Sequence, residues 1–134
     1  MPSIFTRIIN GEIPCFKVAE NDNCFAFLDI NPLAKGHTLV VPKREIDYLF
    51  DLDNDLLQQL TVFSKQVAKA IEKSIPCKRV GVAVIGLEVP HAHIHLIPIN
   101  SVGDINFKNP KLKLSNEELE KIATTIRGNF KANS

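Results

Sequence analysis

The chain has 134 residues, of which 45% are hydrophobic, and these values predict one globular domain over 1–134. Sixteen basic and fifteen acidic residues leave a formal charge of +1, which excludes a global field favouring nucleic acid or an anionic membrane surface. The sequence shows no signal segment and no apolar run near the roughly 20 residues of a membrane span. We therefore expect a cytoplasmic protein that binds neither membrane nor nucleic acid.

The three cysteines, Cys15, Cys24 and Cys77, are odd in number and far apart. This spacing fits neither a disulfide framework nor a Cys-x-x-Cys metal site. We expect buried thiols in a reducing compartment.

The first half of the chain predicts one short helix and two strands. Ser3 is placed to cap a helix over 4–9, whose apolar residues recur at helical spacing, and Asn10-Gly11 offers its end. Residues 24–29 read as a strand, followed by turn residues and then a second strand over 37–41.

The second half predicts two helices separated by strands. Apolar residues repeat every three or four positions from 53 to 75, which indicates a long helix. Residues 80–85 are almost wholly apolar, so we expect a strand covered on both faces. Ser115 and Glu118 form a capping box before the last apolar stripe. Strands joined by short turns, with helices segregated from them, predict an α+β fold with an antiparallel sheet.

Three histidines alternate in the strand-like segment 90–98. Successive side chains of a strand point to opposite faces, so His91, His93 and His95 are expected on one face and Ala92, Ile94 and Leu96 on the other. Neighbours on one face stand about 7 Å apart. This spacing allows the three imidazoles to surround one phosphate group or one metal ion.

Two chemical readings of the cluster stay open. Neutral imidazole is a good nucleophile near pH 7, and its protonated form donates a strong hydrogen bond to phosphate. A single strand histidine is most often a half-buried, hydrogen-bonded side chain, but three together would repel one another when protonated. Three histidines plus water is also a catalytic zinc geometry, although alternating positions give a flattened ligand set.

His91-Ala92-His93-Ile94-His95, followed by Leu96-Ile97-Pro98, resembles the signature of the histidine-triad (HIT) family. The resemblance extends over about residues 4–98. The order of the matching motifs is similar to that in the Hint branch of the family, the nucleoside phosphoramidases. It rests on Ile4-Phe5, Ile8-Ile9, Gly11-Glu12-Ile13-Pro14, Phe25-Ala26-Phe27-Leu28-Asp29-Ile30 and Gly36-His37-Thr38-Leu39-Val40-Val41-Pro42-Lys43. It implies a HIT-like antiparallel sheet of about five strands, a long helix, a C-terminal helix and a homodimer formed through the long helix and a sheet edge.

The resemblance also implies roles for individual residues. His93 would attack the α-phosphate of a purine nucleoside phosphoramidate or related conjugate and carry the nucleotidyl group until water releases it, with no metal or other cofactor. His91 and His95 would orient the nucleophile and contact phosphate oxygens, and His37 would join them from a neighbouring strand. Asp29 would bind the ribose hydroxyls. The residues implied around the base are Ile4, Phe5, Ile8, Ile13, Phe27, Leu28 and Ile30, which composition alone would assign to the core.

The sequence departs from the family pattern just before the triad. Many members have Gly-Gln-Ser or Gly-Gln-Thr where this chain has Gly86-Leu87-Glu88. A carboxylate at Glu88 would repel a polyphosphate leaving group and tolerate a cationic amine, which favours phosphoramidates as substrates. The tail 106–134 also lacks the Trp-Pro-Pro-Gly ending of close relatives. The alternatives are a dinucleoside polyphosphate hydrolase, a non-catalytic nucleotide- or partner-binding protein, and a His-ligated metal protein.

Overall fold

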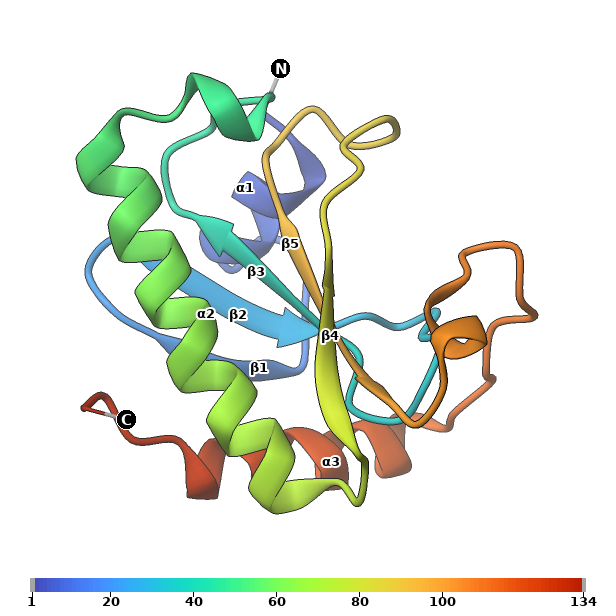
Figure 1. Cartoon of the computed structure of the whole chain (residues 1–134). Helices are drawn as coiled ribbons and strands as arrows, with labels where there is room; N and C mark the ends of the chain where they lie inside the picture. Colours follow the sequence, from blue (N-terminus) through green and yellow to red (C-terminus); the bar gives the residue numbers. More distant parts are fainter. Residues whose placement is uncertain (1, 134) are drawn as a thin grey trace.

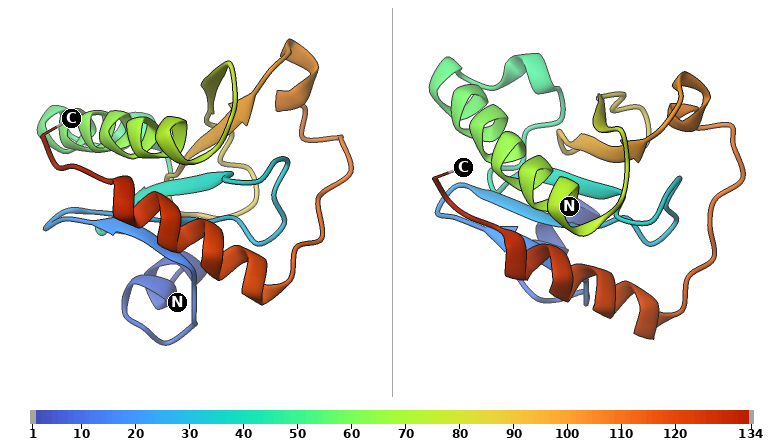
Figure 2. Two further views of the ribbon diagram at one scale, coloured as in Figure 1. Left: turned by 90° about the horizontal axis from the view of Figure 1, so that it is seen from below. Right: turned by 60° about the horizontal axis from the view of Figure 1, so that its bottom comes forward.

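A five-stranded antiparallel sheet forms the middle of three layers in the computed structural model, which describes residues 2–133 (Figures 1 and 2). The strand order is β1-β2-β3-β5-β4. The strands are β1 (Lys17–Glu20), β2 (Cys24–Leu28), β3 (Thr38–Pro42), β4 (Arg79–Ala83) and β5 (Ile94–Ile99). The expected α+β fold with an antiparallel sheet is confirmed.

Helices cover both faces of this sheet (Figure 2). The helices are α1 (Ile4–Ile9), α2 (Asn54–Ser74) and α3 (Asn116–Asn129), with short 3-10 turns η1 (Leu49–Asp51) and η2 (Val102–Ile105). The long α2 and the C-terminal α3 lie on one face, and the short α1 lies on the other. The sheet therefore has a helix-covered core face and a second face on which a site can open.

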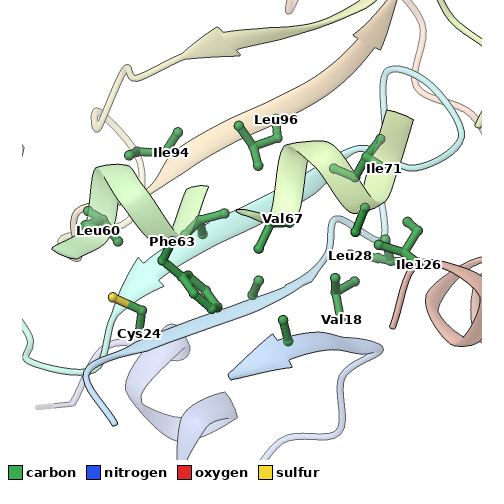
Figure 3. Packing of buried hydrophobic residues seen from close by; sticks show 14 of the residues in the cluster. Val18, Cys24, Leu28, Leu60, Phe63, Val67, Ile71, Ile94, Leu96 and Ile126 are labelled. Atoms are coloured by element: carbon green, nitrogen blue, oxygen red, sulfur yellow. The ribbon is translucent and has the colours of Figure 1, made fainter. Parts of the chain in front are cut away.

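Strand alternation divides the apolar residues between these two faces. In β2, Ala26 and Leu28 belong to the core beneath α2, whereas Phe25 and Phe27 belong to the smaller cluster beneath α1. In β5, Leu96 belongs to the same core cluster as the other residues drawn in Figure 3. Alternate residues of these strands thus belong to opposite faces of the sheet, as strand geometry requires.

The two long helices begin where their caps predict. The Asp53 side chain accepts a hydrogen bond of 2.8 Å from the Leu56 backbone N–H at the start of α2. Ser115 accepts one of 3.1 Å from the Glu118 N–H at the start of α3. These caps satisfy backbone donors that a helix terminus leaves free. Beyond the end of α3, Phe130 packs on the core.

The expectation that residues 80–85 form a strand covered on both faces is wrong. β4 lies at the edge of the sheet, and in the described part of the chain it pairs with β5 alone. The Val82 side chain is 63% exposed. An apolar run shows a strand propensity but not how much of the strand is covered. The sequence also did not indicate β1, a short strand with only two buried residues, Val18 and Ala19.

Within residues 2–133, no helix is long and apolar enough to cross a membrane. The three cysteines are free, as expected from their spacing. Cys24 is buried, whereas Cys15 and Cys77 are only half-buried. Burial raises the pKa of the Cys24 thiol to about 11, which keeps it protonated and unreactive.

Candidate active site

The strand register places a histidine beside two apolar residues on the face that α1 partly covers. Phe27 of β2 pairs with Leu39 of β3, and Leu39 pairs with His95 of β5. Paired residues of neighbouring strands share a face, so these three side chains form one row across the sheet. Phe5 of α1 packs its ring 5.5 Å from that of Phe27 and 5.0 Å from that of His93.

A cavity of about 580 Å³ opens along this row. Its volume lies within the range of small-molecule sites. His37, His93 and His95 line it, together with all nine residues expected to contact substrate: Ile4, Phe5, Ile8, Ile13, Phe27, Leu28, Asp29, Ile30 and Glu88. Leu28 is also 2% exposed and packs in the core on the opposite face (Figure 3). The cavity thus gathers residues from α1, three strands and the loops between them.

The ring of His93 is held by the backbone of His91. The two atoms, His93 Nδ1 and the His91 carbonyl oxygen, lie 2.8 Å apart. A carbonyl oxygen only accepts, so Nδ1 carries a proton and donates it to this bond. In the neutral ring the lone pair then lies on Nε2. His93 is 7% exposed and lines the cavity.

His37 and His95 form a hydrogen-bonded pair whose tautomers follow from the same reasoning. The Leu33 N–H donates to His37 Nδ1 over 3.0 Å, so the proton of the neutral His37 ring lies on Nε2. His37 Nε2 donates to His95 Nδ1 over 3.0 Å. The remaining proton of His95 therefore lies on its Nε2. This arrangement leaves His95 as a hydrogen-bond donor.

Both rings of this pair are neutral at pH 7. Burial lowers the pKa of His37 to about 3, with smaller contributions from the charges of His95 and Lys111. Burial likewise lowers the pKa of His95 to about 4, with His93 contributing. Removal from water disfavours a charged imidazolium, which accounts for both shifts.

His91 departs from the expectation that three imidazoles surround one group. Its Nε2 donates to the Pro42 carbonyl over 2.8 Å, and its Nδ1 accepts from Ser3 Oγ over 2.7 Å. The ring is fully buried and lies outside the cavity lining. β5 begins at Ile94, so the first two histidines precede the regular strand and need not keep its alternation. His91 contributes its backbone carbonyl to the site.

Asp29 lies at the edge of the cavity beside this histidine pair. Its Oδ1 accepts from the Asn31 N–H over 2.9 Å, and its Oδ2 lies 3.6 Å from His37 Nε2. Burial raises the pKa of the carboxyl group. Ligand atoms of Asp29, His37 and His95 all lie within 4.8 Å of one another and could hold a metal ion. This donor set differs from the three alternating histidines considered on the sequence, because His91 has both nitrogens engaged.

Sequence reasoning missed two residues of the segment after β5. Phe107 and Lys111 line the cavity, and the Phe107 ring lies 4.8 Å from the ring of His95. The Leu112 N–H donates to the Pro32 carbonyl over 2.9 Å, which holds this segment beside the turn before β3. No motif marks these residues. An aromatic residue and a lysine in a polar loop were the sole signal.

The site is a small-molecule cavity on one face of an antiparallel sheet, with a hydrogen-bonded histidine pair in its lining. The family model described as the HIT domain matches residues 10–102, and the chain belongs to the HIT family.

Relatives with this fold cover almost the whole chain. The chain is 32% identical to an adenosine 5′-monophosphoramidase of Schizosaccharomyces pombe, over 98% of this chain and all of the relative. It is 38% identical to an uncharacterized HIT-like protein of Methanocaldococcus jannaschii, over 93% of this chain and 98% of the relative. A crystal structure of a HIT-like protein from Bartonella henselae superposes with a TM-score of 0.82 at 32% identity, covering 96% of each chain.

Proposed function

We propose that this protein is a nucleoside phosphoramidase that works through a covalent nucleotidyl intermediate on His93. The observation that carries the proposal is the bond from His93 Nδ1 to the His91 carbonyl, which leaves the Nε2 lone pair free in the cavity. The similarity to an adenosine 5′-monophosphoramidase supports the same activity. A neutral imidazole with a free lone pair is the form that acts as a nucleophile.

In the first step, His93 Nε2 forms a bond to the α-phosphorus while the P–N bond of the substrate breaks. The amine leaves with the bonding electron pair and takes a proton from a water molecule, which becomes hydroxide. The Nε2 proton of His95 donates a hydrogen bond to a phosphoryl oxygen as negative charge develops there. His37 supports this step by keeping the proton of His95 on Nε2.

In the second step, the hydroxide attacks the phosphorus and the bond to His93 Nε2 breaks. The ring recovers its lone pair, and the nucleoside monophosphate is released. One water molecule therefore balances both steps. Splitting the displacement in two replaces one difficult step by two easier ones.

The remaining cavity residues fit a nucleoside. Asp29 lies at its edge, where a carboxylate accepts hydrogen bonds from ribose hydroxyls. The apolar walls contributed by α1 and β2, including Phe5 and Phe27, fit a purine base. An apolar slot with a few polar groups is the usual composition of a small-molecule site.

We further propose that Glu88 favours an amine over a polyphosphate as leaving group. Glu88 and the 88%-exposed Leu87 line the cavity. In the family pattern that this sequence resembles, these two positions are a glutamine and a serine or threonine. A carboxylate there repels an anionic leaving group. The test compares kcat/KM for adenosine 5′-phosphoramidate and a dinucleoside polyphosphate. Wild-type preference for the phosphoramidate should weaken in Glu88→Gln, and wild-type preference for the polyphosphate would overturn the assignment.

The experiment on the activity itself measures AMP release from adenosine 5′-phosphoramidate by the wild type and by His93→Ala, each with a metal chelator present. We expect an active wild type and a loss of at least about 10³-fold in the variant, as for removal of a nucleophile. Nucleotide binding without turnover in either protein would favour a non-catalytic binding protein. Activity abolished by the chelator would favour a metal enzyme at Asp29, His37 and His95.

We also propose a homodimer formed through the edge strand β4 and α2. Both present exposed apolar side chains, Val82 on β4 and Val62 on α2, at 63% and 54% exposure. An open strand edge is a template for pairing with a second copy. Sedimentation equilibrium should give a dimer that Val82→Asp converts to monomers. A monomeric wild type at micromolar concentration would contradict the proposal.

A further inference from the structure

The charges that line the cavity do not by themselves favour an anionic substrate. Asp29 and Glu88 are acidic, and burial keeps His37 and His95 neutral at pH 7. Among the cavity-lining residues, all within the described range 2–133, Lys111 is the single cation. A nucleotide brings further negative charge, which a nearby cation would stabilise.

Lys111 is held close to the histidine end of the cavity. Its Nζ donates to the carbonyl of Phe107 over 2.6 Å and to the carbonyl of Asn109 over 3.2 Å. The Phe107 ring in turn lies 4.8 Å from the ring of His95 and 6.3 Å from that of His37. The hydrogen bond to the Phe107 carbonyl therefore links the ammonium group to the residue whose ring packs on the histidine pair.

The Lys111 ammonium group retains capacity for a ligand. An ammonium has three donors, and the two carbonyls engage two of them. The charge also acts on the groups beside the reacting centre: it contributes to lowering the pKa of His37 and offsets part of the burial that raises the pKa of Asp29. Lys111 lines the cavity, so its remaining donor is available to a ligand held there.

We propose that Lys111 is a phosphate-binding residue that neutralises the non-bridging oxygens of the α-phosphate held at His93. This inference rests on the proposed nucleotide site. It assigns a function to the segment after β5, which no motif indicated. The ligand class is a mononucleotide whose α-phosphate is terminal or carries an amide.

A purely structural role for Lys111 makes a different prediction. If its ammonium group only fixed the loop through the Phe107 and Asn109 carbonyls, removing it would weaken the binding of charged and uncharged ligands alike. A phosphate-binding role affects the charged ligand alone. AMP and adenosine are a matched pair for this comparison, because they differ in the phosphate group.

The experiment measures Kd for AMP and for adenosine by calorimetry in the wild type, Lys111→Met, Lys111→Arg and Lys113→Met. Lys113 lies in the same segment, is exposed and does not line the cavity, so Lys113→Met is the matched control. We expect Lys111→Met to lose about 10- to 100-fold in AMP affinity, the range for a charge-assisted hydrogen bond. Adenosine affinity should stay within about 2-fold, and Lys111→Arg should recover most of the loss.

Three outcomes would overturn the proposal. Unchanged AMP affinity in Lys111→Met, or equal losses for AMP and adenosine, would remove the phosphate-binding role while leaving the proposed function intact. A wild type that binds neither ligand would overturn the phosphate-binding role, and it would overturn the proposed function as well if it also failed to turn over adenosine 5′-phosphoramidate. Turnover of adenosine 5′-phosphoramidate by the same wild-type preparation separates failure of the binding site from failure of the chemistry.

Discussion

The backbone carbonyl of His91 lies 2.8 Å from Nδ1 of His93, and this hydrogen bond determines which nitrogen of the neutral His93 ring carries the lone pair. The carbonyl is itself fixed, because the His91 ring is bonded on one side to Pro42 and on the other to Ser3. The first histidine of the triad thus acts as a positioning residue for the second. The N-terminal helix is connected to the His93 ring through this chain of hydrogen bonds.

Ser3→Ala should destabilise the fold by about 1–2 kcal/mol. Ser3 Oγ accepts from the Thr6 N–H at the start of α1 and also donates to His91 Nδ1, so the variant loses a helix cap and leaves a buried ring nitrogen without its donor. Urea denaturation measures the change. Ser3→Thr, which keeps the hydroxyl, should recover most of the stability. If Ser3→Thr lost as much stability as Ser3→Ala, side-chain fit rather than the hydroxyl would matter at this position.

Stability should fall on acidification from pH 6.5 to about pH 4. In the unfolded chain His37 and His95 titrate near 6.5, whereas in the fold their pKa values are about 3 and about 4. The unfolded state therefore binds more protons in this window, and each histidine contributes up to about 1.4 kcal/mol per pH unit. The contribution of the two neutral histidines to stability is therefore fully present above pH 6.5 and is lost as the pH falls.

The control for this pH effect is His37→Gln, measured by urea denaturation at a series of pH values. Removing one of the two groups should reduce the slope of unfolding free energy against pH. An unchanged slope in His37→Gln would show that other groups account for the acid sensitivity.

Gly36→Ala should destabilise the protein more than Gly86→Ala. Both glycines have a positive φ, +93° and +73°, where an L side chain costs about 1–2 kcal/mol. At Gly36 an added Cβ would also lie 2.9 Å from Ile75 Cγ1, whereas at Gly86 nothing lies within 4 Å. Overpacking adds about 1–3 kcal/mol to the first variant. Equal midpoints in urea for the two variants would contradict this difference.

The helices could be predicted from the sequence because the signals for a helix lie close together in the chain. The caps at Ser3, Asp53 and Ser115 and the helical spacing that follows them each depend on residues within one or two turns. The edge position of β4 depends instead on strand order, which is set by contacts between distant segments. Its apolar run therefore gave the correct element type and the wrong environment.

The cavity was predictable to the extent that the family motif covers it. His37, His93 and His95 all line it, but of these three His95 alone lies within a strand, so alternation accounts for its position and not for the other two. The tautomers were not predictable, because they depend on the carbonyl of His91 and the N–H of Leu33. Lys111 was missed because a loop without regular structure carries no periodic signal.

The measurement that tests the account most directly is the detection of a nucleotidyl group on His93. The wild type is mixed with adenosine 5′-phosphoramidate, quenched in alkali, where a phosphorus–nitrogen bond to histidine survives, and analysed by intact and peptide mass spectrometry. We expect one adenylyl adduct on the peptide that contains His93 and none in His93→Ala. Turnover without any adduct, with His93→Ala retaining the wild-type rate, would contradict covalent catalysis by this residue.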